Sequence, residues 1–191
     1  MQFAMTFDYL CPFARNASEA VLNGLDDGRD WQPRFLAFSL SQIHTGDDEP
    51  DVWDEPANKS GVLALQWGIA VRDNMPDQFP SVHRAIFAAR FDHGGDLKDE
   101  AVIREAVTGA GADAHAIAEL VATGSPIETL AAEHTESVAK WSVFGVPTFI
   151  VDDHATFIRF ISRGDVDDLQ RALELLTWTE LNEFKRTVIP R

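Results

Sequence analysis

The residue with the clearest chemistry in this sequence is Cys11, the only cysteine among 191 residues. It follows an apolar stretch and precedes Pro12, a residue type favoured in the first turn of a helix. Unpaired N–H groups and the helix dipole favour an anion there, so the sequence predicts a Cys11 thiol pKa below the ordinary value of about 8.5. The alternative for a lone cysteine is inert packing, because free cysteine is among the most buried residue types. Redox chemistry at Cys11 needs a second molecule, since no internal disulfide can form.

A second segment of interest is Gly145-Val146-Pro147-Thr148-Phe149, which leads into an apolar run typical of a strand. Taken alone, Pro147 is interpreted as an edge-strand proline with a trans peptide bond, because only about 5 to 6% of X-Pro bonds are cis. This segment indicates a family only when it is considered together with the segment around Cys11.

The elements that must position these segments begin with a strand, a helix and a strand. Residues 1–8 are rich in apolar side chains and predict a buried strand, and helical spacing after Cys11 predicts a helix that ends near residues 26–28. Residues 31–40 predict a second strand. From about residue 58 to residue 123 only helical periodicity occurs, so we expect a block of helices.

The second half of the chain predicts the order helix, strand, strand, helix. Ser125 is the expected N-cap of a long helix, since a proline follows it and a glutamate comes three residues later. Residues 146–151 and 156–161 predict two strands joined as a hairpin. Asp165 is the expected N-cap of a final amphipathic helix. The fold class is therefore α/β, with an all-helical segment inserted into the sheet framework.

Together, Cys11-Pro12-Phe13-Ala14 and the segment at 145–149 resemble the DsbA-like thioredoxin family. The resemblance implies a thioredoxin-like fold with a large all-helical insertion. Residues 1–45 and 125–176 would form the thioredoxin-like domain, 58–124 the insertion, and 177–191 a C-terminal extension.

Carried over by resemblance, Cys11 matches the nucleophilic cysteine, Pro12 and Phe13 match the variable dipeptide, and Pro147 matches a cis proline that lies against the active site. Ala14 departs from the pattern, because it stands where the family has its resolving cysteine. The dithiol–disulfide cycle of a DsbA oxidase therefore cannot run within this chain.

Relatives without the second cysteine are similar to kappa-class glutathione transferases and 2-hydroxychromene-2-carboxylate isomerases, which use a serine where Cys11 stands. Their scheme implies that the backbone of Val146 pairs with the cysteinyl part of a thiol cofactor. It also implies that Asp165 binds the γ-glutamyl amine of glutathione, whereas the residue pattern alone makes Asp165 a helix cap. No covalently bound cofactor is expected, and glutathione or another low-molecular-weight thiol is the candidate ligand.

The charge composition argues against two classes of binding partner. A formal net charge of −15 argues against nucleic acid and against anionic membranes, which both require clustered basic residues. The N-terminus lacks the basic and apolar regions of a signal peptide, so we expect a cytoplasmic location. No two histidines stand at i, i+4 spacing, and no metal site is assigned; His83 and His134 are interpreted as packing or surface residues.

Three functions follow from these observations. The preferred one is a monothiol oxidoreductase, in which Cys11 attacks a disulfide or an electrophile and a low-molecular-weight thiol resolves the adduct. The second is a glutathione-type S-transferase or isomerase, in which the cofactor thiol is the nucleophile. The third is a non-catalytic protein that binds peptides or small ligands beside Pro147. The partner is a small-molecule thiol or disulfide in the first two, and the sequence leaves a homodimer open.

Overall fold

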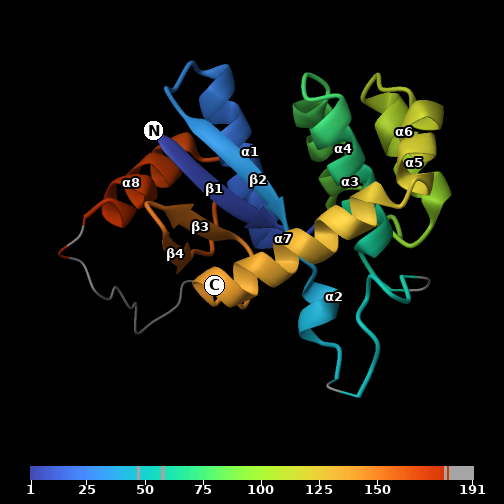
Figure 1. The fold of residues 1–191 in the computed structure, drawn as a ribbon. Helices are drawn as coiled ribbons and strands as arrows, with labels where there is room; N and C mark the ends of the chain where they lie inside the picture. The colour runs from blue at the N-terminus through green and yellow to red at the C-terminus, as the bar shows by residue number, and fades with distance from the viewer. Residues whose placement is uncertain (47, 57–58, 179, 181–191) are drawn as a thin grey trace.

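The computed structural model describes residues 1–46, 48–56, 59–178 and 180, and its sheet has four strands. Their order across the sheet is β2-β1-β3-β4 (Figure 1). The first two strands are parallel, and the other neighbouring pairs are antiparallel. The strands are β1 (Gln2–Phe7), β2 (Gln32–Ala37), β3 (Thr148–Val151) and β4 (His154–Phe157).

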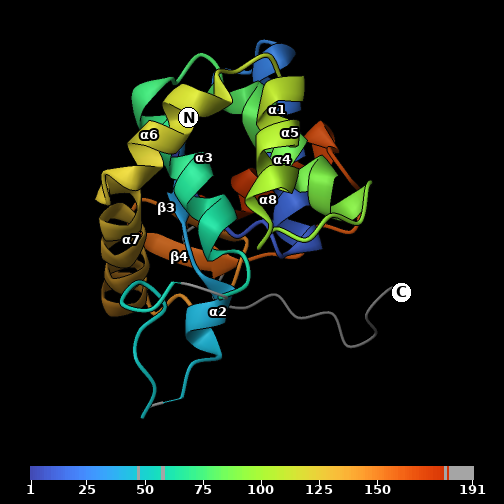
Figure 2. The ribbon, with the colours of Figure 1, turned by 90° about the vertical axis from the view of Figure 1, so that its right-hand side faces the viewer.

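Helices cover both faces of the sheet. The longest, α7, lies on one face and α1 and α8 lie on the other, while α3 to α6 gather beyond β2 (Figures 1 and 2). None of the described helices is long and apolar enough to cross a membrane. The helices are α1 (Pro12–Asp26), α2 (Leu40–Ile43), α3 (Val62–Asn74), α4 (Phe79–Phe91), α5 (Glu100–Gly109), α6 (Ala114–Ala122), α7 (Ser125–Trp141) and α8 (Val166–Leu176).

Strand β1 runs through the centre of the core, and its alternating side chains divide between the two faces. Phe3, Met5 and Phe7 are buried in the main apolar cluster, which also contains side chains of α1, α3 and α4. Ala4 points to the other face, where it joins a small cluster that packs against Trp141 of α7. The central strand is thus buried on both faces, as expected for a strand covered by helices on both sides.

The edge strand β2 is tied to the helices by a pair of charged side chains. Arg72 of α3 donates a hydrogen bond to the carbonyl oxygen of Phe35 at 2.7 Å, and the carboxylate of Glu133 of α7 accepts one from the N–H of Ala37 at 2.6 Å. The guanidinium and the carboxylate also pair with each other at 2.8 Å. Burial alone would lower the pKa of Arg72, but the neighbouring carboxylates of Asp73 and Glu133 outweigh burial and raise it.

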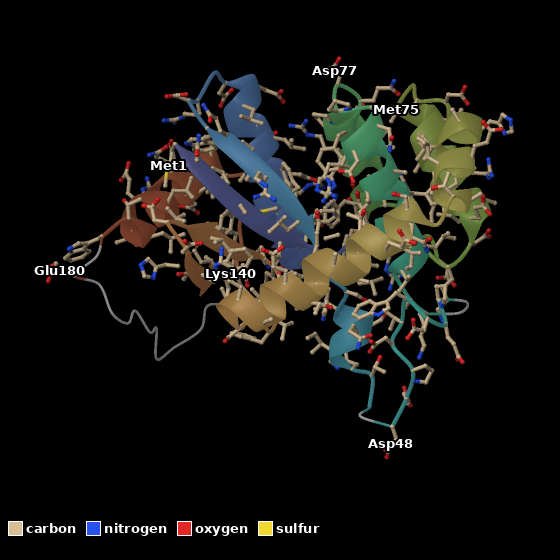
Figure 3. All side chains as sticks on the ribbon, viewed as in Figure 1. Met1, Asp48, Met75, Asp77, Lys140 and Glu180 are labelled. Carbon is tan, nitrogen blue, oxygen red and sulfur yellow. The ribbon has the colours of Figure 1, made fainter. Side chains whose placement is uncertain are left out.

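Figure 3 shows Lys140 near the C-terminal end of α7, where that helix passes in front of the sheet. Its ammonium lies 3.0 Å from the carboxylate of Asp153, in the turn between β3 and β4, and 4.5 Å from the ring centre of Trp141. These contacts hold the end of α7 on the hairpin that follows the Pro147 loop.

Two predicted boundaries are wrong. Helix α7 begins at Ser125 with Gly124 as its N-cap, because the φ of 83° at Gly124 makes the turn into the helix. Strand β4 spans His154–Phe157 rather than 156–161, because Asp152 and Asp153 adopt φ values of 48° and 64° and make a tight turn. His154 therefore already pairs with Val151.

The other expected elements are confirmed, with small shifts at their ends. The region from 58 to 123 contains α3 to α6 and no strand among its described residues, and Asp165 caps α8 by accepting a hydrogen bond from the N–H of Asp168. The strand expected over 31–40 ends at Ala37, and α2 begins three residues later. Residues 179 and 181–191 of the predicted C-terminal extension lie outside the described residues, and the division into domains stays a prediction.

Candidate active site

Cys11 is the N-cap of α1 and lies at the C-terminal end of β1. Its extended backbone (φ −101°, ψ 117°) ends the turn after the strand, and Pro12 takes the first helical position. The N–H of Cys11 donates to the carbonyl of Asp8 at 3.0 Å, and the carbonyl of Cys11 accepts from Arg15 at 3.1 Å. The side chain thus stands at the helix N-terminus, as the sequence predicts.

The segment that contains Pro147 lies directly against Cys11. The Val146–Pro147 bond is cis, as the resemblance implies. The thiol of Cys11 donates a hydrogen bond to the carbonyl oxygen of Val146 at 3.3 Å, although 135 residues separate the two. Among the described residues, the N–H of Val146 has no hydrogen-bond partner. The fold therefore brings Cys11, Pro12, Phe13, Val146 and Pro147 to one place.

The protonation of Cys11 differs from the prediction. Burial raises the pKa of the Cys11 thiol, and the N–H groups of Ala14 and Phe13 oppose the rise only in part. The buried carboxylate of Asp8 raises this pKa further, whereas the guanidinium of Arg159 lowers it. The prediction of a lowered pKa is wrong because the residue is only 8% exposed, and the loss of water outweighs the helix N-terminus.

Asp8 holds the loop that carries Cys11. Its carboxylate accepts hydrogen bonds from the N–H of Leu10 at 2.8 Å and from the N–H of Leu40 at 2.7 Å, so it joins this loop to the start of α2. Burial raises the pKa of Asp8 to about 6, against those two hydrogen bonds. The residue pattern before Cys11 does not distinguish Asp8 from an ordinary residue at the end of a strand.

A buried polar chain lies beneath the same loop. The hydroxyl of Tyr9 lies 2.8 Å from Nδ1 of His83, and Nε2 of His83 lies 3.1 Å from the hydroxyl of Ser18. All three residues are fully buried, which confirms that His83 is a packing residue. These two hydrogen bonds link the Cys11 loop to α4, and α4 to α1.

The rim of the site is apolar with one cation. Phe13 is half-buried, and the guanidinium of Arg159 lies 5.3 Å from its ring centre. Phe144, two residues before Val146, is 67% exposed and packs against Phe157 with a ring separation of 5.1 Å. Nothing in the local sequence distinguishes Arg159 from other surface arginines, so it could not be predicted as a site residue.

Asp165 takes part in the fold in a different way. Its carboxylate caps α8, and the preceding Gly164 donates its N–H to the carbonyl of Asn16 in α1 at 3.2 Å. No hydrogen bond joins Asp165 to the five residues gathered at the site. The structure therefore places it beside α1 with a capping role.

The groups that could contact a ligand here are suited to a small thiol. The N–H and C=O of Val146 form one short edge, Cys11 provides a thiol, and Phe13 with Arg159 forms a wall. Among the described residues, no three His, Cys, Asp or Glu side chains come together as metal ligands would.

The four-stranded order with a helix starting at the cysteine and a cis proline opposite it defines a thioredoxin fold. The family model described as the DSBA-like thioredoxin domain matches residues 56–174, more than half of the chain. The chain belongs to this family. The match starts after α1 and so does not include Cys11.

Solved structures share this fold. A 2-hydroxychromene-2-carboxylate isomerase is similar with a TM-score of 0.65 and 18% identity, over 92% of this chain and 96% of that one. The cytosolic disulfide reductase DsbM from Pseudomonas aeruginosa, solved with GSH, gives 0.63 and 15%, over 92% and 98%. BdbD from Bacillus subtilis gives 0.61 and 13%, over 91% and 85%. No curated protein sequence matches the chain significantly.

Proposed function

We propose that this protein is a thiol-dependent oxidoreductase that acts through Cys11 on small thiols and disulfides. The observation that carries the proposal is the hydrogen bond from the Cys11 thiol to the carbonyl of Val146, next to the cis proline. It puts the one sulfur nucleophile of the chain beside a backbone edge that can align a ligand. The similarity to a disulfide reductase solved with GSH supports the choice of a thiol partner.

The reaction needs two external sulfur compounds because Ala14 cannot resolve an adduct. Cys11 first loses its proton to solvent, and the thiolate attacks one sulfur of a disulfide. A Cys11 mixed disulfide forms, the substrate S–S bond breaks, and the second half leaves as a thiolate. A low-molecular-weight thiolate, with glutathione as the candidate, then attacks the substrate sulfur of the mixed disulfide and releases the Cys11 thiolate. One half of the substrate has then left as a thiolate, and the other half leaves as a mixed disulfide with the small thiol, which a second molecule of that thiol can cleave.

The residues around Cys11 would assist in separate ways. The N–H groups of Phe13 and Ala14 stabilise the thiolate once it has formed. The carbonyl of Val146, freed when the thiol loses its proton, and the unpaired N–H of the same residue can hold the ligand backbone. The assignment of Asp165 to the γ-glutamyl amine stays a proposal, and it requires the carboxylate to serve a ligand while it caps α8.

A second candidate function is a glutathione-type S-transferase or isomerase, and the raised pKa of Cys11 favours it. A protonated Cys11 is a hydrogen-bond donor, and a donor at this position could stabilise the thiolate of a bound cofactor in place of attacking a substrate. Here the cofactor sulfur would be the nucleophile, and Cys11→Ser would keep activity because a hydroxyl also donates.

Mass spectrometry tests both candidates. The protein is incubated with oxidised glutathione and with cystine, and the expected result is one mixed disulfide on Cys11 that reduced glutathione removes. Cys11→Ser is the control and should form none. If no adduct forms on the folded protein even at alkaline pH, the oxidoreductase proposal fails. Glutathione-dependent activity that survives in Cys11→Ser would then support the second candidate, and its absence would support a binding protein.

A further inference from the structure

Two charged groups act on the Cys11 thiol, and only one of them can meet a ligand. Asp8 is fully buried and engaged with the backbone of Leu10 and Leu40. Arg159 is exposed. Of the two, Arg159 is therefore the charged group that a ligand from solvent can reach.

Arg159 is held in place by its neighbours on both sides. The N–H of Ile158 donates to the carbonyl of Pro147 at 3.1 Å. The side-chain amide of Asn16 in α1 donates to the carbonyls of Phe160 and Ile161 at 2.9 and 3.1 Å. The short segment that carries Arg159 thus bridges the two elements that meet at Cys11.

The guanidinium of Arg159 keeps its donors available. It lies over the ring of Phe13, 5.3 Å from the ring centre, and none of the described residues accepts a hydrogen bond from its N–H groups. Throughout the described part of the chain, Arg159 pairs with no carboxylate, although acidic residues outnumber basic ones by 31 to 16. A planar guanidinium with free donors is well suited to a carboxylate.

The net charge of the whole protein bears on the role of the unpaired Arg159. A net charge of −15 repels an anionic substrate, and an unpaired cation beside the site offsets this repulsion locally. We propose that the substrate of the Cys11 site is a thiol or disulfide that carries a carboxylate, and that Arg159, steadied on Phe13, binds this carboxylate. This inference rests on the proposed function for its sulfur chemistry and adds the substrate class.

The first test uses thioethers, which cannot exchange with Cys11. Binding of 3,3′-thiodipropionate, with two carboxylates, and of the neutral 2,2′-thiodiethanol is measured by saturation-transfer NMR on the whole protein. We expect Arg159→Gln to weaken binding of the dicarboxylate about fivefold and to leave the neutral compound unchanged. Arg90→Gln, which removes an equal charge from another exposed arginine, should change neither. Equal binding of the dicarboxylate to the wild type and Arg159→Gln overturns the inference.

The second test separates this inference from the oxidoreductase proposal. Rates of mixed-disulfide formation at Cys11 are compared for 3,3′-dithiodipropionate, neutral bis(2-hydroxyethyl) disulfide and cationic cystamine. Each rate is divided by that of the neutral disulfide, which removes any effect of Arg159 on thiol protonation. Arg159→Gln should lower the relative rate of the anionic compound about fivefold and raise that of cystamine. An unchanged ratio in Arg159→Gln counts against the carboxylate site. If Cys11 reacts with none of the three while thiodipropionate binding still depends on Arg159, the oxidoreductase proposal fails and the carboxylate site stands.

Discussion

The hydroxyl of Tyr9 and Nδ1 of His83 lie 2.8 Å apart in the core, 74 residues apart in the sequence. Burial lowers the pKa of His83 to about 3, so the imidazole is neutral and has one donor and one acceptor nitrogen. Tyr9 and Ser18 occupy these two nitrogens. The residue two positions before Cys11 is thereby fixed to α4, and the site depends on the helical block for its shape.

The stability of the protein should fall in acid because of His83. In the unfolded chain this histidine titrates near 6.5, whereas in the folded chain it stays neutral down to about pH 3. Its contribution to stability is therefore complete above pH 6.5 and is lost as the pH falls towards 3, by up to about 1.4 kcal/mol per pH unit. Urea unfolding between pH 7.5 and pH 5 measures the slope.

His83→Gln should flatten this slope, since glutamine does not titrate, and the exposed His115→Gln should leave it unchanged. Asp8 acts in the opposite sense, because its raised pKa lets the folded chain take up a proton near pH 6 that the unfolded chain does not bind. Asp8→Asn should therefore steepen the acid loss. If the slope in His83→Gln equals that of the wild type, His83 is not neutral in the folded protein as described.

Gly68 allows Tyr9 to reach His83, and enlarging it should be costly. A Cβ atom at position 68 of α3 would lie 2.4 Å from the Tyr9 hydroxyl oxygen, closer than any contact allows. We expect Gly68→Ala to lower the free energy of unfolding by about 1–3 kcal/mol through this overlap. Gly109→Ala is the control, because nothing lies within 4 Å of its Cβ position and the change should be neutral or stabilise by up to about 1 kcal/mol. Equal stability of the two variants in urea would contradict the packing at Tyr9.

Alkylation of Cys11 should require alkaline pH. Since burial raises the pKa of its thiol, the rate with iodoacetamide should still rise above pH 9. Asp8→Asn removes a negative charge that acts on the thiol and should shift the profile to lower pH. Asp77→Asn makes the same change on the exposed α3–α4 connection (Figure 3) and should not shift it. Circular dichroism checks that each variant is folded. A wild-type profile that levels off below pH 8 would refute the description of Cys11.

Restoring a second cysteine should create an internal disulfide. Position 14 is one turn after Cys11 in α1, and residues three apart at a helix start lie about 5 Å apart at Cα, within the range that a disulfide spans. Ala14→Cys should therefore lose both free thiols under mild oxidation, as counted with a thiol reagent after denaturation. Ala17→Cys places the new thiol at another buried alanine of α1, one turn further on, and should keep both thiols.

Local patterns predicted the parts of the site that are set locally. Pro12 at the first helical position fixed the place of Cys11, and the resemblance supplied the cis bond at Pro147. The fold class followed from the order of strands and helices, because periodicity separates the helical block from the sheet. The hairpin was predicted but the start of β4 was misplaced, since the turn takes only Asp152 and Asp153, which both adopt positive φ, and His154 already belongs to the strand.

Apart from the contact between Cys11 and the Pro147 segment, which the resemblance implied, contacts between distant segments could not be predicted. His83 reaches Tyr9 from α4, and Arg159 reaches Phe13 from the segment after β4, so neither stood out among residues of its type. The pKa of Cys11 was misjudged for the same reason. A helix N-terminus is visible in the sequence, whereas the extent to which other segments cover the sulfur is not, and that coverage decides the direction.

The hydrogen bonds of Arg72 and Glu133 with the backbone of β2 limit how two copies of this protein can associate through their sheets. An open sheet edge can accept a strand from another molecule through its free backbone groups. On β2, the carbonyl of Phe35 and the N–H of Ala37 are already occupied, and Pro33 has no N–H to offer. Pairing of sheets between molecules is therefore hindered along β2. The four-residue strand β4, at the opposite edge of the sheet, keeps its outer backbone groups accessible to another strand.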